Sequence, residues 1–189
     1  HDDTINRTSN GTGAISSMTL ATAKSYDFGS WKNIKYKGTK IPTFEELIIL
    51  CRNLGLHPYI KIKNTTAFTE GQLQNIVDIV KAYGMSENSS YISFTMSYLS
   101  VIAKYDKYAR LGFLTSAKYN STIVNNTLAL RNGTNKVFLD LYSNVYKSYI
   151  NDCKSNALPI EIWTVNGKDN IRSIDGYVSG VTSDDTNVE

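Results

Sequence analysis

Cysteine and proline are scarce in this chain, which has two cysteines and three prolines. Cys51 and Cys153 lie far apart in the sequence and share no metal-ligand spacing, which excludes a cysteine-based metal site. They fit either a single disulfide or two buried thiols, and we favour buried thiols. Polar residues follow each cysteine within a helix-like segment, so we expect neither of them to act as a nucleophile.

Long hydrophobic runs are absent too. No apolar run approaches the roughly 18 residues that a membrane-spanning helix requires, so we expect no transmembrane segment. A hydrophobic share of 41% with 20% charged residues is typical of a globular chain with a sizeable core. The chain lacks an initiator Met and a signal peptide, so we expect a mature product or a fragment of something longer. Its length suits one domain, and we expect residues 1–189 to form one.

A strong net charge is also missing. The net charge is +3, and we expect the charges to be scattered, with no cluster of Lys and Arg interleaved with aromatic residues. This argues against nucleic acid as a partner. No Gly-rich phosphate loop follows any predicted strand, which argues against a nucleotide site. The compartment stays open, since a bacterial or phage protein of the cytoplasm or of the cell surface would fit equally well.

What the chain does have is an alternation of helical and extended segments. Six strands that alternate with helices predict a parallel sheet with crossover helices, hence the α/β class. An open doubly wound sheet and a (βα) barrel with two units missing both fit this pattern. We expect helices at 17–26, 43–54, 69–83, 96–106, 120–131, 145–156 and 167–174, and strands at 58–63, 91–94, 109–114, 137–141, 160–165 and 177–181.

Two helix starts have recognisable capping residues. Ser17 is the candidate N-cap of the first helix. Thr43 is the candidate N-cap of the second, with Glu45 and Glu46 in the first turn near the positive end of the helix. A glycine follows the predicted end of the second helix at Gly55, and we expect it to stop that helix.

Six short motifs follow one another along the chain, each on an element of the expected type. In this order they resemble the glycerophosphodiester phosphodiesterase family, and the resemblance covers the whole chain. One of them, Trp163-Thr164-Val165-Asn166, matches a family strand letter for letter. The motifs are His1-Asp2 with Asn6-Arg7-Thr8 and Gly11-Thr12-Gly13, Ile41-Pro42-Thr43 between Gly38 and Glu46, Tyr59 to Lys63, Ile92-Ser93-Phe94, Trp163 to Asn166, and Gly180 to Asp184, where Ser183 replaces the usual Thr.

The resemblance implies a TIM barrel with its active site at the carboxyl ends of the strands. It implies hydrolysis of a glycerol- or polyol-linked phosphodiester, such as a deacylated phospholipid or a teichoic-acid-like polymer, with a divalent Ca or Mg ion as cofactor. The family's His-Arg and Glu-x-Asp motifs lie on its first two strands, upstream of the segment that begins here at His1. We therefore expect barrel strands three to eight in this chain. The first two would come from upstream sequence or another chain, or be absent.

The resemblance also assigns roles to individual residues. His1 would be the general acid that protonates the leaving alcohol, paired with a histidine upstream of this chain. Lys63 would contact the phosphate as a point charge. Phe94 and Trp163 would line the pocket, although both would be equally at home as core aromatics. Asn166 fits either a pocket donor or a turn residue.

Lys61 departs from the family pattern, because the family usually has a metal-ligating Glu at this position. A lysine ammonium has three donors and no acceptor, so it cannot ligate a metal while charged. We therefore predict no metal ligand in this chain and favour a loss of metal-dependent activity. A degenerate barrel that binds a polyol phosphate without cleaving it is the alternative function, and we expect these 189 residues alone to be inactive. His57, at the amino end of a strand, receives no role.

Overall fold

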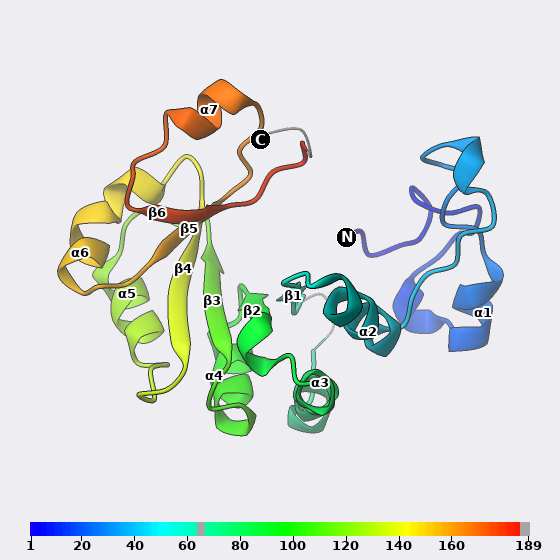
Figure 1. Ribbon diagram of the computed structural model, residues 1–189, viewed down its shortest axis with the longest axis horizontal. Coiled ribbons are helices and arrows are strands. Elements are labelled where there is room, and N and C mark those ends of the chain that lie inside the picture. The colour runs from blue at the N-terminus through cyan, green and yellow to red at the C-terminus, as the bar shows by residue number, and fades with distance from the viewer. Residues whose placement is uncertain (64–66, 186–189) are drawn as a thin grey trace. The chain divides into compact units, whose positions relative to one another are not determined.

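The computed structural model describes residues 1–63 and 67–185. The chain divides into two compact units, residues 1–54 and residues 55–189 (Figure 1). The first unit contains the helices α1 (Leu20–Ser25) and α2 (Phe44–Leu54) and the short 3-10 helices Ile15–Ser17 and Ile34–Tyr36. Its described residues form no strand beyond the isolated bridge between Thr4 and Ala14.

The capping predictions for the first unit have different outcomes. The N-cap of α1 is Thr19, whose Oγ1 accepts a hydrogen bond from the Thr22 amide at 3.1 Å. The prediction of Ser17 was wrong, because its hydroxyl donates to the Ala14 carbonyl inside a preceding 3-10 turn. Thr43 does cap α2: its Oγ1 accepts from the Glu46 amide at 3.1 Å, and the Glu46 carboxylate accepts from the Thr43 amide at 2.8 Å. This reciprocal pair is a capping box.

The second unit is a parallel six-stranded sheet with helices between the strands. The strands follow chain order from β1 to β6, and every neighbouring pair is parallel. The sheet curls, as Figure 1 shows, with α4 packed against β2 and β3 and α5 against β4. The elements are β1 Tyr59–Lys61, α3 Glu70–Ala82, β2 Ser90–Ser93, α4 Met96–Tyr105, β3 Arg110–Thr115, α5 Ser121–Leu128, β4 Lys136–Tyr142, α6 Ile150–Ser155, β5 Ile160–Trp163, α7 Lys168–Arg172 and β6 Val178–Val181.

The predicted alternation of strands and helices is therefore confirmed, with one helix divided. The segment 145–156 contains a 3-10 helix, Tyr146–Ser148, before α6 begins. Tyr149 stands at this junction, fully buried, with its hydroxyl donating to the Lys118 carbonyl at 3.0 Å. Anchoring the tyrosine on the preceding loop fixes the chain where the helix would otherwise have continued.

Side chains alternate between the two faces of the sheet, as the extended backbone requires. Residues such as Tyr91, Leu111 and Leu139 are fully buried on the helix-covered face. The inner face of the curl carries Phe138 opposite Gly112. A Cβ at Gly112 would lie 2.3 Å from Phe138 Cζ, so only glycine leaves room for this ring.

Both cysteines are free and buried, as expected. Burial, with a further contribution from the Asp152 carboxylate, raises the pKa of the Cys153 thiol to about 12. A thiol with so high a pKa is a poor nucleophile near neutral pH. Among the described residues, no helix is both long and apolar enough to cross a membrane.

Candidate active site

A row of three aromatic rings with a lysine at one end lies at the carboxyl ends of four strands. Phe94, directly after β2, and Trp163, the last residue of β5, meet edge to face with ring centroids 5.8 Å apart. The ring centroid of Tyr142, at the end of β4, lies 5.1 Å from that of Trp163. Lys61, the last residue of β1, has its Nζ 5.4 Å from the Phe94 ring centroid. The fold thus brings together Lys61, Phe94 and Trp163, which are far apart in sequence.

The core of the sheet holds Trp163 in place. Its ring packs against the cluster of buried Ile92, Leu114 and Phe138. Its Nε1 donates a hydrogen bond to the Asp140 carbonyl at 3.2 Å. Phe94 remains 39% exposed, so it forms the rim of the row rather than part of the core.

A buried ion pair occupies the inner face below this row. The Arg110 guanidinium, from the start of β3, bonds the Glu161 carboxylate of β5. The same guanidinium donates to Ser90 Oγ at 2.6 Å and to the Tyr59 hydroxyl at 3.1 Å. It also lies 4.2 Å from the Phe138 ring centroid. Neither member of the pair is among the residues that we predict for the site. The sequence did contain a signal, because each of them is a charged residue within a short, mostly apolar predicted strand.

Asp140 of β4 is a further titratable residue on this face and was also not predicted. It is only 2% exposed, and its Oδ1 has no hydrogen-bond partner in the described part of the chain. Burial, followed by the neighbouring Glu161 carboxylate, raises the pKa of Asp140 to about 7, while Lys61 and Arg110 oppose the rise. A carboxyl of this kind exchanges its proton near neutral pH.

His57 lies at the amino end of β1, away from the aromatic row. Its Nε2 is 2.8 Å from Ser90 Oγ, and burial and then the Arg110 charge lower the pKa of its imidazole. The absence of a role for His57 in the site stays a prediction, which follows from its place at the amino end of a barrel strand.

Asn166 ties the loop after β5 to the end of β6. Its Oδ1 accepts hydrogen bonds from Ser183 Oγ at 3.0 Å and from the Asp184 amide at 2.9 Å, and its Nδ2 donates to the Asp184 carboxylate at 3.2 Å. Of the two roles considered for Asn166, these contacts favour the turn residue. Lys63 lies just beyond β1, half-buried.

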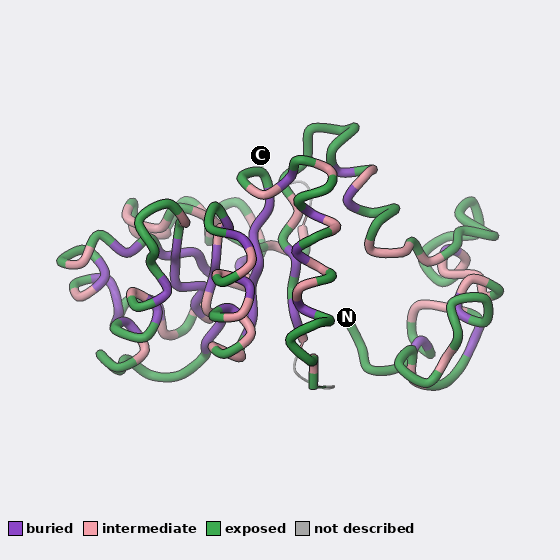
Figure 2. Tube along the Cα trace, turned by 90° about the horizontal axis from the view of Figure 1, so that it is seen from below, coloured by how far each residue is buried: buried purple, intermediate pink, exposed green. Residues whose placement is uncertain are grey.

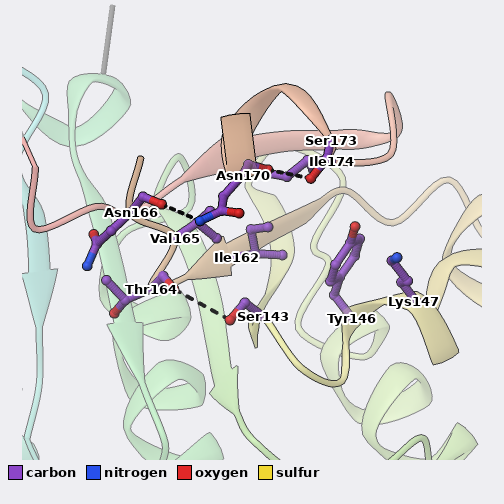
Figure 3. Close-up of a pocket in the computed structure, with 10 residues that line it drawn as sticks. All are labelled: Ser143, Tyr146, Lys147, Ile162, Thr164, Val165, Asn166, Asn170, Ser173 and Ile174. Atoms are coloured by element: carbon purple, nitrogen blue, oxygen red, sulfur yellow. Dashed lines mark hydrogen bonds between the residues drawn. The ribbon is translucent and has the colours of Figure 1, made fainter. Parts of the chain in front are cut away.

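A pocket of about 290 Å³ lies beside Asn166 (Figure 3). Ile162, which alternates with Trp163 along the strand, faces this pocket. Its polar lining is largely engaged with backbone: Asn170 Nδ2 donates to the Asn166 carbonyl at 2.8 Å and Ser173 Oγ to the Asn170 carbonyl at 2.7 Å. The pocket is therefore separate from the aromatic row.

His1 belongs to the first unit, and its part in the site stays a prediction. Its side chain is 70% exposed, with Nδ1 3.6 Å from the Asp2 carboxylate. Arg7 donates two hydrogen bonds to the same carboxylate, at 2.7 and 3.1 Å. Asp2 thus links the His-Asp motif to the Arg-Thr motif that follows it.

Comparison with known proteins decides the family. The model of the glycerophosphoryl diester phosphodiesterase family matches residues 1–188. The chain belongs to this family. A glycerophosphodiester phosphodiesterase of Caldanaerobacter subterraneus is 28% identical over 187 residues, which cover 98% of this chain and 75% of that protein.

Solved structures of this family share the fold. A phosphodiesterase of Oleispira antarctica, solved in complex with sn-glycerol-3-phosphate, superposes with a TM-score of 0.78 at 20% identity, covering 97% of this chain and 73% of the other. A glycerophosphodiester phosphodiesterase of Agrobacterium tumefaciens gives a TM-score of 0.70 at 17% identity, covering 97% and 76%. The curled six-stranded sheet is thus of the TIM-barrel type. Of the two architectures that fitted the sequence pattern, the barrel is correct and the open doubly wound sheet is not.

Enzymes of this family generally depend on a divalent cation, but the described residues of this chain offer no complete site for one. In the described ranges, no group of three or more His, Cys, Asp or Glu side chains converges on a point. The two carboxylates of the inner face, Asp140 and Glu161, are accompanied by the cations Lys61 and Arg110. Lys61 and Arg110 already balance the charge of these carboxylates, so the inner face offers little net negative charge to attract a divalent cation.

Proposed function

We propose that the protein hydrolyses glycerol- or polyol-linked phosphodiesters, and that its six strands are strands three to eight of a TIM barrel. The family match over residues 1–188 carries this proposal. The cation and aromatic row at the carboxyl ends of the strands support it, because that end of the barrel holds the active site in this fold.

The chemistry of the row suits such a substrate. A phosphodiester is anionic and gains negative charge at its oxygens toward the transition state, so nearby cations stabilise it. Lys61 and Lys63 would supply positive charge, and the exposed edge of Phe94 with Trp163 would pack against the carbon skeleton of the glycerol or polyol.

His1 would protonate the leaving alcohol as the bond from phosphorus to that oxygen breaks. The oxygen of a water molecule forms the new bond to phosphorus, and its proton passes to a histidine of the upstream sequence. The products are the free alcohol and a phosphomonoester.

One observation favours a second function. Lys61 stands where the family has a metal-ligating Glu, and its ammonium lies over Phe94. A barrel with this change can hold a polyol phosphate through charge and aromatic contacts without cleaving it. The degenerate binding module is therefore the alternative to the hydrolase.

The test compares turnover and binding on the same protein preparations. The 189-residue chain and a longer form with its native upstream sequence are incubated with glycerophosphoglycerol and glycerophosphocholine, with EDTA or with added Mg²⁺ or Ca²⁺, and the released alcohol is measured. Hydrolysis by the longer form, reduced at least about 100-fold by His1→Ala and unchanged by His57→Ala, supports the enzyme.

Calorimetry with sn-glycerol-3-phosphate separates the two functions. Binding of sn-glycerol-3-phosphate without turnover of either substrate, whichever metal is added, supports the binding module. The Lys61→Glu variant then tests whether a carboxylate at this position restores metal-dependent hydrolysis. The absence of both turnover and binding in the longer form contradicts both functions.

A further inference from the structure

A loop of the first unit, residues 28–40, exposes apolar and basic side chains together; we name it the lysine–aromatic loop. Its large apolar residues Trp31, Ile34 and Tyr36 are 49%, 73% and 47% exposed. No acidic residue occurs from 28 to 44, and four lysines do: Lys32, Lys35, Lys37 and Lys40. The expectation of scattered charges without interleaved aromatics was wrong for this stretch.

The loop is held in one shape by its own hydrogen bonds. The Asp27 carboxylate accepts from the Gly29 amide at 2.7 Å, from the Ser30 amide at 3.1 Å and from Ser30 Oγ at 2.5 Å. The Phe28 amide donates to the Thr39 carbonyl at 2.8 Å and closes the ends of the loop. The Asp27 carboxylate is therefore used as an internal tie of the loop, and the four lysines outnumber this one acidic residue between positions 27 and 44.

The backbone of the loop also depends on a close approach at Gly29. A Cβ at this position would lie 1.9 Å from the Tyr36 carbonyl oxygen, which belongs to backbone and cannot move aside. The Trp31 side chain is also held in place, because its Nε1 donates a hydrogen bond to the Phe28 carbonyl at 2.9 Å. The indole is thus oriented before any partner arrives, which lowers the entropy cost of binding.

The cations and the rings share one surface. Lys35 Nζ lies 4.8 Å from the Tyr36 ring centroid. The Arg7 guanidinium and Lys32 Nζ lie 5.7 and 6.0 Å from the Trp31 ring centroid. Ile34 stands between these two aromatic residues in the chain and is the most exposed of the three apolar side chains.

We propose that the lysine–aromatic loop docks the protein on the surface of a bilayer that contains anionic lipids. Trp and Tyr favour the level of the lipid headgroups, and lysines are attracted to a negatively charged leaflet. Ile34 selects the bilayer over a soluble polyanion, because an isolated aliphatic side chain finds no partner on a chain of phosphates but enters the acyl boundary of a membrane.

The experiment is co-sedimentation of the protein with vesicles of phosphatidylglycerol and phosphatidylcholine, against vesicles of phosphatidylcholine alone. We expect strong binding to the anionic vesicles, falling as salt is raised. The triple variant Lys32→Ser, Lys35→Ser, Lys37→Ser should lower the affinity at least about 10-fold. Ile34→Ser should lower it roughly 5-fold, and Ile34→Leu should retain it.

Matched changes outside the loop control for charge and for exposed apolar area. Lys136→Ser replaces an exposed lysine, and Leu56→Ser replaces a leucine that is 53% exposed. Both should bind anionic vesicles like the unchanged protein. Circular dichroism of each variant confirms that the fold is retained.

Any of three results would overturn the proposal. Equal binding to both kinds of vesicle would show that the charge of the loop does not contribute to binding. So would an unchanged affinity of the triple lysine variant for anionic vesicles. Binding to soluble polyphosphate as tight as to vesicles, with Ile34→Ser changing neither, assigns the loop to a polyanion instead. Turnover of water-soluble phosphodiesters is measured separately, so a failure here leaves the proposed hydrolysis untouched.

Discussion

The two units of the chain are held together in different ways. In the first unit the buried apolar residues that the structure describes are Ile5, Ala23, Ile48 and Cys51, whereas those of the second unit lie along strands β1 to β5 and on the helices α3 to α6. Figure 2 shows the same contrast, with long buried segments in the sheet and mostly exposed backbone in the first unit. The first unit depends on single polar contacts, such as those of Asp27 and Thr43, and the second on burial of apolar surface.

The contrast teaches where each unit is vulnerable. Loss of one polar tie in the first unit should act locally, because few buried contacts transmit the change. In the second unit, substitutions matter most where charge is buried among apolar neighbours, because an unpaired charge there has lost its water. Four predictions sharpen this comparison, beginning with the largest effect.

Removing Glu161 should produce the largest loss of stability. Glu161→Ala leaves the Arg110 guanidinium buried without its carboxylate, which should cost about 3–5 kcal/mol in the free energy of unfolding. Urea denaturation measures the loss. Glu70→Ala, which breaks the exposed pair with Lys104, should cost much less, because water screens both side chains. Equal losses from the two substitutions would contradict the role assigned to burial.

Asp140 should make stability depend on pH. Its pKa is raised in the folded state, so its contribution is fully present below the ordinary pKa near 4 and is lost as pH rises toward 7. The free energy of unfolding of Asp140→Asn, relative to that of the unchanged protein, should therefore rise between pH 4 and pH 8 by on the order of 3 kcal/mol. Thermal denaturation across this range tests the sign, with Asp169→Asn, which changes a fully exposed aspartate, as the matched control.

Crowding the inner face should have an intermediate effect. Gly112→Ala places a methyl group against Phe138 and should cost about 1–3 kcal/mol. Gly71→Ala in α3 meets nothing within 4 Å and should be neutral or slightly stabilising. The difference between their urea midpoints is the measurement, and a neutral Gly112→Ala would show that the face is less tightly packed than the contacts imply.

Untying the lysine–aromatic loop should have the smallest effect on global stability. Asp27→Ala removes three hydrogen bonds that the carboxylate accepts, and it should open the loop without unfolding the second unit. Those bonds, led by that of the Ser30 hydroxyl, hold the pKa of Asp27 well below its usual range, so the tie should persist in mild acid and fail only in strong acid. Faster tryptic cleavage after Lys32, Lys35 and Lys37, with an unchanged urea midpoint, is the expected outcome.

Much of the fold could be predicted because its signals are local. Alternating apolar segments predicted the parallel sheet, and Thr43 with Glu46 predicted the start of α2. Ser17 failed as a cap because Thr19, two residues later, competes for the same role and the 3-10 turn takes the Ser17 hydroxyl. Short-range propensity does not decide between two neighbouring hydroxyls.

The sequence by itself determined the order of elements and the family motifs, since each is written in neighbouring residues. It also placed Phe94 at the end of a strand, whereas the strand predicted at 160–165 runs two residues past Trp163, where β5 ends. Only the tertiary structure decided that Arg110 reaches Glu161, 51 residues away, and that one oxygen of Asp140 is buried without a partner. These facts depend on the curl of the sheet, which turns side chains from separate strands toward one interior and sets how much water reaches them.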